Sequence, residues 1–310
     1  MRDKFIVSSS PHIRHIDTTS SIMLDVIIAL CPAAIYGCIL FGWRAVIILL
    51  STVASAVLSE FAWCKLTHKP NTIGDLSAVV TGLLLGMNLS SLLPFWMAII
   101  GSAVAVIVVK QMFGGLGHNF ANPAITARIV LLVSFPAAMT KYAPVFSKID
   151  TVTSATPLAQ SSDEVIGFTD LFFGRHGGCI GETSAFLLLV GGVYLVLRRV
   201  ISPIIPVSFI GTVALMALVF DVNISVYVFG GGLMLGAIFM ATDYTTSPTT
   251  PLGKLIFGIG CGAIAFVIRK WSNLPEGVSY AILLMNILTP HINTLTKRKP
   301  FGVKEAAKNE

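Results

Sequence analysis

Charged residues are scarce in this sequence. Asp, Glu, Lys and Arg make up only 12% of its 310 residues, whereas soluble proteins carry about 25%. This shortage excludes a soluble globular domain, a disordered tail and a nucleic-acid-binding module, because the net charge of +6 forms no basic stripe with interleaved aromatic residues. With 55% hydrophobic residues and a mean hydropathy of +0.83, the chain is predicted to be an all-α, polytopic membrane protein.

Cysteine and histidine are too few and too scattered for the common ligand patterns. The five cysteines form no Cys-x-x-Cys pair and no even framework, so neither a disulfide scaffold nor a cysteine-ligated metal site is indicated. The six histidines include no pair at the helical i, i+4 spacing, so haem ligation is not expected. No P-loop and no Ser-His-Asp arrangement is present. We therefore predict no metal site and no hydrolase-type nucleophile.

Apolar stretches predict about ten transmembrane helices in one integral membrane domain, 1–310, because a span needs about 20 apolar residues. The first five spans are expected at 23–42, 45–63, 76–93, 95–110 and 124–139, and the last five at 184–197, 203–220, 227–242, 255–270 and 278–295. The spans form a first repeat, 23–139, and a second repeat, 184–295. The polar stretch 140–183 separates them, and 296–310 is a terminal tail.

The distribution of Lys and Arg predicts the orientation. With both termini in the cytoplasm, fourteen of these residues fall on the cytoplasmic side and six on the opposite side, as the positive-inside rule favours. Arg269 and Lys270 fall on the disfavoured side. This orientation makes 140–183 an extracytoplasmic loop, and long loops of this kind are usually functional or disordered.

The two halves share short sequence similarities. Residues 82–86 read Gly-Leu-Leu-Leu-Gly and 232–236 read Gly-Leu-Met-Leu-Gly, while 101–110 resembles 260–269. Five spans per half would place two repeats in opposite orientations, an arrangement that puts binding sites near the bilayer midplane. The alternative is a chance match between segments rich in Gly and Leu.

The loop contains a short sequence with specific chemistry. It runs from Asp150 through Thr153, Ser154 and Ala155 to Thr156, and it resembles the Asp-x-x-(Ser/Thr)-Gly-Ala-Thr acceptor to which a flavin transferase attaches FMN. The resemblance implies a phosphoester between FMN and the Thr156 hydroxyl. Ser154 stands where the acceptor usually has Gly. The alternative is a Ser/Thr-rich loop without a cofactor.

Two further stretches resemble one family of membrane proteins. Residues 114–124 read Gly-Gly-Leu-Gly-His-Asn-Phe-Ala-Asn-Pro-Ala, and residues 239–248 read Phe-Met-Ala-Thr-Asp-Tyr-Thr-Thr-Ser-Pro. Both are similar to signatures of the family that includes the RnfD proteins of Rnf complexes and the NqrB proteins of sodium-pumping NADH:quinone reductases. Tyr244 replaces the family's usual Pro, so a different local backbone is expected there. Together with the loop motif, the resemblance covers nearly the whole chain.

This resemblance implies a flavin-carrying subunit of an ion-translocating ferredoxin:NAD+ oxidoreductase in the cell membrane. Covalent FMN on Thr156 would pass electrons between subunits, coupled to Na+ or H+ translocation. The implied partners are the other Rnf subunits, including one with a second covalent FMN, and a flavin transferase during maturation. A noncovalent riboflavin is also implied. The alternatives are a cofactor-free solute channel or carrier built on inverted repeats, and a structural scaffold.

Several polar residues near the spans are candidates for binding or ion transfer. Asn119 and Asn122 follow a Gly-rich stretch that is unsuited to a helix and mark a re-entrant turn that contacts a flavin, an ion or a partner; the alternative is an ordinary cytoplasmic loop. The acidic residues near spans are Asp25, Glu60, Asp75, Asp221 and Asp243. Most are expected to be solvated helix ends, with Asp243 and Asp25 as candidates for an ion path.

Arg128 is a basic residue predicted inside a span. It lies one turn from the expected cytoplasmic end of span 124–139. The side chain is expected either to extend to the membrane interface or to hold a phosphate or a carboxylate.

Overall fold

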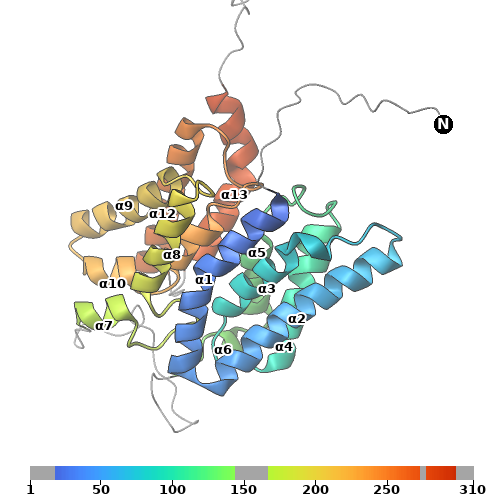
Figure 1. The fold of residues 1–310 in the computed structure, drawn as a ribbon. Coiled ribbons are helices and arrows are strands. Elements are labelled where there is room, and N and C mark those ends of the chain that lie inside the picture. Colours follow the sequence, from blue (N-terminus) through green and yellow to red (C-terminus); the bar gives the residue numbers. More distant parts are fainter. Residues whose placement is uncertain (1–17, 144–166, 273–276, 298–310) are drawn as a thin grey trace, which may run out of the picture.

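The computed structural model of the chain describes residues 18–143, 167–272 and 277–297. These residues form helices and connecting turns and contain no β-strand (Figure 1). The prediction of an all-α polytopic membrane protein is confirmed. Three helices are long and apolar enough to cross a membrane: α1 (Thr19–Phe41), α2 (Trp43–Leu66) and α12 (Pro251–Trp271).

Most of the remaining helices lie close to their predicted positions, except α7, which falls within the stretch 140–183 that was predicted as a loop. They are α4 (Phe95–Ala103), α5 (Pro123–Ser134), α6 (Pro136–Met139), α7 (Phe168–Phe173), α8 (Ala185–Leu197), α9 (Ile204–Val219) and α13 (Gly277–Thr296). The predicted span 124–139 is divided at Phe135, because a residue that precedes a proline is disfavoured in the α conformation. A short 3-10 helix, η1 (Ile73–Asp75), leads into α3.

Two predicted spans are broken rather than continuous. Span 76–93 contains α3 (Ser77–Met87), which ends before a turn at residues 88–94. Span 227–242 contains α10 (Ile224–Phe229), α11 (Leu233–Leu235) and the π-helix η3 (Gly236–Met240). Three consecutive glycines at 230–232 separate α10 from α11, and each interior glycine costs a helix about 1 kcal/mol. A second π-helix, η2 (Val104–Gln111), continues α4.

The helices of each half pack in the same order. In the first half α2 packs against α3 and α4, and in the second half α9 packs against α10 and α12. Contacts between α1 and α8 and between α5 and α13 join the halves. In each half a helix thus packs against part of a broken span and against the helix that follows that span.

Glycines allow several of these helices to pack closely against one another. A Cβ on Gly82 of α3 would lie 2.8 Å from the carbonyl oxygen of Thr52 in α2, and one on Gly262 of α12 would lie 2.9 Å from that of Phe209 in α9. Small residues are typical of helix interfaces in membranes, where close packing replaces the hydrophobic effect between helices.

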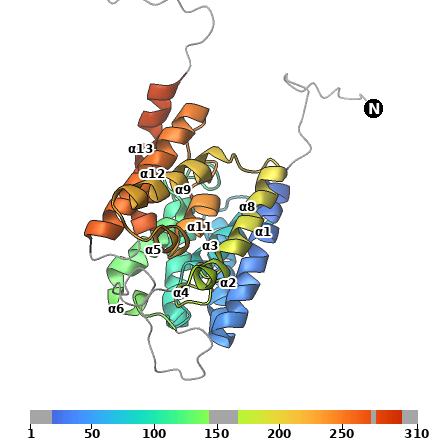
Figure 2. The same cartoon turned by 90° about the vertical axis from the view of Figure 1, so that its left-hand side faces the viewer.

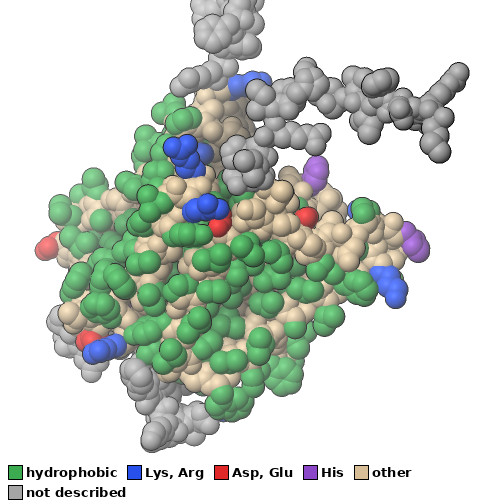
Figure 3. Space-filling model, in the orientation of Figure 1, with side chains coloured by type: hydrophobic (Ala, Val, Ile, Leu, Met, Phe, Trp, Pro, Cys, Tyr) green, Lys and Arg blue, Asp and Glu red, His purple; other side chains and the backbone are tan. Residues whose placement is uncertain are grey.

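The surface is suited to contact with lipid. Figure 3 shows hydrophobic side chains over most of the visible face, with the few charged side chains toward its upper part and edges. Large apolar residues such as Ile35, Leu50 and Leu215 are at least 60% exposed. An apolar surface of this extent is not found on soluble monomers, which agrees with the prediction of a membrane protein.

The two ends of the bundle differ in which segments they contain. The start of α1 and the end of α13 lie in the upper part of the molecule in Figures 1 and 2. Helices α6 and α7, which flank residues 144–166, lie in the lower part of Figure 1. The segments nearest the termini and the segments that flank the predicted flavin loop are therefore at opposite ends.

Candidate functional site

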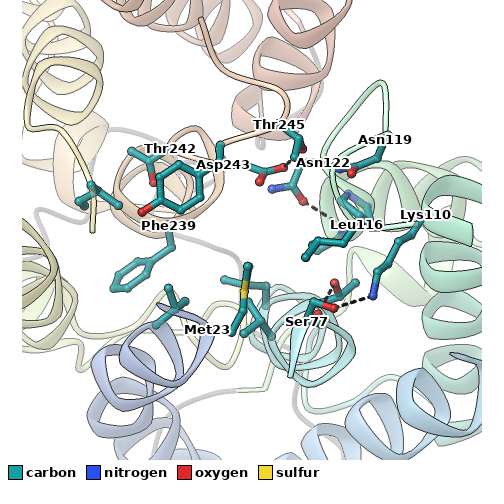
Figure 4. Close-up of a pocket in the computed structure, with 18 of the residues that line it drawn as sticks. Met23, Ser77, Lys110, Leu116, Asn119, Asn122, Phe239, Thr242, Asp243 and Thr245 are labelled. Atoms are coloured by element: carbon teal, nitrogen blue, oxygen red, sulfur yellow. Dashed lines mark hydrogen bonds between the residues drawn. The ribbon is translucent and has the colours of Figure 1, made fainter. Parts of the chain in front are cut away.

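The two family-like signatures meet at one cavity, which Met23 near the start of α1 also lines (Figure 4). The first signature contributes Leu116, Asn119 and Asn122, and the second contributes residues 239 and 242–245. The cavity has a volume of about 90 Å³, which is enough for a few water molecules or a small ion. Stretches more than one hundred residues apart in sequence thus form a single site.

Asn122 joins the two signatures. As the N-cap of α5 its side-chain oxygen accepts hydrogen bonds from the backbone N–H groups of Ala124 (3.0 Å) and Ile125 (3.4 Å), as Asn does at helix N-termini. Its Nδ2 donates to the carbonyl oxygen of Met240 at 3.1 Å. The Asn122 side chain therefore ties the start of α5 to the end of η3 at the cavity wall.

Asn119 also lines the cavity, and a third asparagine contacts Asn122 from α13. Asn119 is 8% exposed and donates to the carbonyl oxygen of Ala121 at 3.3 Å. With its amide oriented to satisfy both neighbours, Asn286 of α13 accepts from the Asn122 N–H (3.2 Å) and donates to the carbonyl oxygen of Thr246 (3.3 Å). Asn286 lies outside both signatures, and the sequence offered no signal for it.

Asp243 is the carboxylate at the cavity. It lies in the turn after η3, where its Oδ2 accepts from the hydroxyls of Thr245 (3.1 Å) and Thr246 (3.2 Å). Burial raises the pKa of the Asp243 carboxyl above its ordinary value, although the hydrogen bonds from Thr245 and Thr246 act in the opposite direction. The neighbouring Tyr244 donates its hydroxyl to the carbonyl oxygen of Val200. Tyr244 thus packs the signature against the turn after α8.

Lys110 brings a second charged cluster to the cavity. Its ammonium group lies 2.9 and 3.1 Å from the two carboxylate oxygens of Glu60 and 2.7 Å from Ser77 Oγ. Glu60 also accepts from Gln111 Nε2 at 2.9 Å and from the Thr72 hydroxyl at 2.6 Å. The expectation of a solvated helix end is wrong for Glu60, because its side chain is fully buried and paired across α2 and η2.

Arg128 is buried at the centre of the bundle and does not extend to the interface. The side chain, 3% exposed, comes from the sixth residue of α5. Its Nη1 donates to Asn88 Oδ1 (2.9 Å) and Ser279 Oγ (3.1 Å), and its Nη2 donates to Glu182 Oε1 (3.3 Å) and Cys179 Sγ (3.5 Å). Of the two expectations for Arg128, the structure selects the one in which it holds a carboxylate.

Glu182 is therefore not part of a solvated outer loop. Residues 178–185 are all buried, so the final portion of the predicted extracytoplasmic loop, 140–183, packs inside the bundle. The N–H groups of Ile180 and Gly181 donate to the carbonyl oxygens of Leu89 (3.0 Å) and Met87 (2.8 Å). The segment folds back into the bundle because the broken end of α3 offers it these backbone carbonyls.

Asp25, the other acidic residue predicted on an ion path, has a different environment. Its carboxylate pairs with Arg198 at 3.1 Å and accepts from the Tyr194 hydroxyl at 2.8 Å. Asp25 is absent from the cavity lining, although Met23 and Val26 of the same helix face the cavity. These contacts tie α1 to α8.

Arg269, which the charge count placed on the disfavoured side, is also buried. Its guanidinium donates to the carbonyl oxygens of Tyr227 (2.6 Å) and Gly230 (3.3 Å) at the end of α10. A cation at a helix C-terminus is favourable because of the orientation of the peptide dipoles. Arg269 therefore does not act as a loop charge, and neither does Lys110.

The predicted flavin acceptor cannot be compared with these sites. Asp150, Thr153, Ser154, Ala155 and Thr156 all lie outside the described residues.

Comparison with known proteins covers nearly the full length. The model of the NQR2, RnfD, RnfE family matches residues 6–302. The chain is 48% identical to the D-type subunit of the Na(+)-translocating ferredoxin:NAD(+) oxidoreductase complex of Acetobacterium woodii, over 97% of this chain and 96% of the relative. It is 41% identical to the D-type subunit of the proton-translocating ferredoxin:NAD(+) oxidoreductase complex of Clostridium ljungdahlii, over 97% of each. The D-type subunit of the ion-translocating oxidoreductase complex of Stutzerimonas stutzeri is 39% identical over 91% of each.

Proposed function

The chain belongs to the NQR2, RnfD, RnfE family, and from this premise we propose that it is a flavin-carrying membrane subunit of a redox-driven ion pump. The full-length similarity to the D-type subunits of ferredoxin:NAD+ oxidoreductase complexes carries the proposal. The chain acts as one subunit of the complex and not as a complete enzyme. Its partners are the other subunits, including one with a second covalent FMN.

The proposed attachment point for FMN is Thr156. Its hydroxyl supplies the oxygen for a phosphoester, and residues 150–155 supply the sequence that the flavin transferase reads. FMN bound there supplies one- and two-electron chemistry, while the protein determines its position and surroundings. The position of α6 and α7 at the end of the bundle away from the termini supports an attachment point on the extracytoplasmic side.

The proposed orientation places both termini in the cytoplasm and the chain as a multi-pass protein of the cell membrane. Two observations support it. Lys and Arg are concentrated on the side of the termini, and the start of α1 and the end of α13 share one end of the bundle. The cavity with Asp243 then opens toward the cytoplasm.

Noncovalent riboflavin stays a prediction. The cavity volume of about 90 Å³ is well below the range of about 300–1,000 Å³ that is typical of small-molecule sites. The cavity does not fit a flavin ring system in this conformation. A cation of the size of Na+, or a proton carried by water, fits it and would find the Asp243 carboxylate there.

Flavin fluorescence tests the covalent attachment. The chain is expressed with its flavin transferase, denatured and separated on a gel. We expect a fluorescent band that Thr156→Ala removes and Ser161→Ala, a hydroxyl exchange outside the motif, leaves intact. A dark wild-type band would overturn the proposal of covalent FMN, and fluorescence that survives Thr156→Ala would place the attachment elsewhere.

Ion transfer is tested in vesicles that contain the whole complex. Cation uptake should follow the oxidation of ferredoxin by NAD+ and should stop without either substrate. Uptake of a neutral solute without electron transfer would instead favour the cofactor-free carrier.

A further inference from the structure

The segment 174–184 enters the bundle, where residues 178–184 are buried. The proposed function assigns no role to it. It lies between α1 and the broken end of α3. The carbonyl of Ile180 packs against Gly37 of α1 so closely that a Cβ there would overlap it, and a Cβ on Gly181 would lie 2.5 Å from that of Met87. Two glycines therefore make room for this segment.

A short series of contacts connects the cavity to this segment. Asn122 at the cavity wall donates to the carbonyl oxygen of Met240, and Asn88 Nδ2 lies 3.2 Å from the sulfur of the same Met240. Asn88 in turn accepts from Arg128, which holds Glu182. Polar groups thus run from the cavity, past both broken helices, to Glu182. A cation that entered at Asp243 and followed these polar groups would meet Arg128.

The charge at this point opposes cations. Arg269 donates to the carbonyl oxygen of Gly230, two residues before Gly232, and a Cβ on Gly232 would lie 2.7 Å from Glu182 Oε1, so a second buried guanidinium lies in the same part of the bundle. The surplus positive charge is buried, where charges interact far more strongly than in water. A fixed arginine of this kind is one way in which pores exclude cations.

Few of the segment's own polar groups hold it in place. Neither His176 Nε2 nor Thr183 Oγ1 has a hydrogen-bond partner among the residues that the structure describes. The segment is held by the Arg128–Glu182 pair, by the two backbone hydrogen bonds to the end of α3 and the turn after it, by the N–H groups of Gly174 and Arg175 that donate to the carbonyl oxygen of Asp170, and by the burial of Ile180.

We propose that segment 174–184 is a plug that the Arg128–Glu182 pair keeps closed, and that a cation crosses the bundle only when this pair separates. The inference rests on the proposed function, because it assumes that the subunit contains the ion path. It assigns different roles to the two charges. Arg128 supplies the barrier, and Glu182 attaches the plug to it.

Passive leakage tests these roles without electron transfer. Vesicles that contain the whole complex, without ferredoxin or NADH, receive a potassium-diffusion potential, and the entry of radioactive Na+ and of protons is measured. We expect Arg128→Gln to increase leakage at least about tenfold, because the barrier is removed and buried Glu182 then attracts cations. Glu182→Gln should increase leakage less, because it releases the plug but leaves the positive charge of Arg128 in place. Arg128→Lys, which keeps the charge, should stay tight.

Two results would overturn the proposal: an Arg128→Gln complex as tight as the wild type, or equal leakage from Arg128→Gln and Glu182→Gln, which would indicate a purely structural pair. Cation uptake driven by ferredoxin oxidation in the same wild-type vesicles tests the proposed function separately. An Arg128→Gln complex that stays tight, beside a wild-type complex that pumps, contradicts only the plug, whereas a wild-type complex that never pumps contradicts the pump itself.

Cys179 provides a second measurement on the wild-type complex. Its thiol is 2% exposed within the plug. A membrane-impermeant maleimide should label it during turnover but not at rest, and Cys179→Ser identifies that label among the other cysteines. Pumping without any labelling of Cys179 would show that the plug stays in place, and would overturn the proposal even if the Arg128 variants fail to assemble.

Discussion

Gly232 lies directly against the carboxylate of Glu182. A Cβ on Gly232 would be 2.7 Å from Glu182 Oε1 and 3.6 Å from Arg128 Nη1. The break in the second span, between α10 and α11, thus lies next to the buried ion pair. Only a residue without a side chain leaves room for the pair at this position.

Gly232→Ala should therefore loosen the pair. The added methyl group displaces the flexible end of Glu182 from Arg128, so the plug should open more often. We expect faster labelling of Cys179 in the resting complex than in the wild type. Gly211→Ala is the control, because a Cβ at Gly211 meets no atom within 4 Å. Equal labelling of the two variants would contradict the close contact.

Lys110→Met should destabilise the chain strongly. It leaves Glu60 buried without its cation, and the loss of one partner of a buried pair costs about 3–5 kcal/mol. The double variant Glu60→Gln/Lys110→Met should recover much of this loss, because neither charge remains. Thermal unfolding of the purified protein measures both, with Lys65→Met at the exposed end of α2 as the control. A double variant less stable than Lys110→Met would show that the two side chains do not act as a pair.

Gly262→Ala should separate α12 from α9. Its Cβ would lie 2.7 Å from that of Thr212 and 2.9 Å from the carbonyl oxygen of Phe209, and overpacking of this kind costs about 1–3 kcal/mol. Gly211→Ala on α9 should be neutral or slightly stabilising, since Ala favours a helix by about 1 kcal/mol. The thermal midpoints of the two variants should shift in opposite directions, and equal shifts would argue against tight packing at Gly262.

Asp243 should make stability depend on pH. Because its pKa is raised in the folded protein, the folded state binds this proton more tightly than the unfolded state, whose Asp titrates near pH 4. The stabilisation is complete below about pH 4 and is lost as the pH rises through the raised pKa. Asp243→Asn should thus be more stable than the wild type at pH 8, with the difference vanishing toward pH 4. A difference that is constant with pH would contradict the raised pKa.

Asp243 and Asp25 should differ in ion transfer. Asp243→Asn should abolish the cation uptake that ferredoxin oxidation drives, since it removes the carboxylate at the cavity. Asp25→Asn should leave uptake largely intact and lower stability by about 1 kcal/mol or less, because Arg198 is 51% exposed and such pairs contribute little. Uptake driven in vesicles separates the two. Loss of uptake in Asp25→Asn alone would move the ion path to the contact between α1 and α8.

The helices followed largely from hydropathy, but their breaks did not. A hydropathy window averages apolar content over a span and does not register whether the helix is continuous, so 76–93 and 227–242 were predicted as single helices. The glycines at 230–232 were visible in the sequence. The need for a glycine at Gly232 depends on Glu182, whose carboxylate packs against it from another part of the chain.

The candidate site was predicted in pieces. Asn122 and Asp243 were identified separately, but not their meeting at one cavity across more than one hundred residues. Glu60, Lys110 and Glu182 were taken as exposed charges, because a sequence places charges in water by default. Only the packed structure shows the partners that offset the free-energy cost of burying a charge.

The 54 residues that separate Arg128 from Glu182 also have a consequence for biosynthesis. The ribosome delivers α5 to the membrane before the carboxylate that neutralises Arg128 has been made. An unpaired arginine in a nascent span costs about 2.5–3.5 kcal/mol on insertion scales. The first half is thus less stable in lipid until segment 174–184, which carries Glu182, has been made.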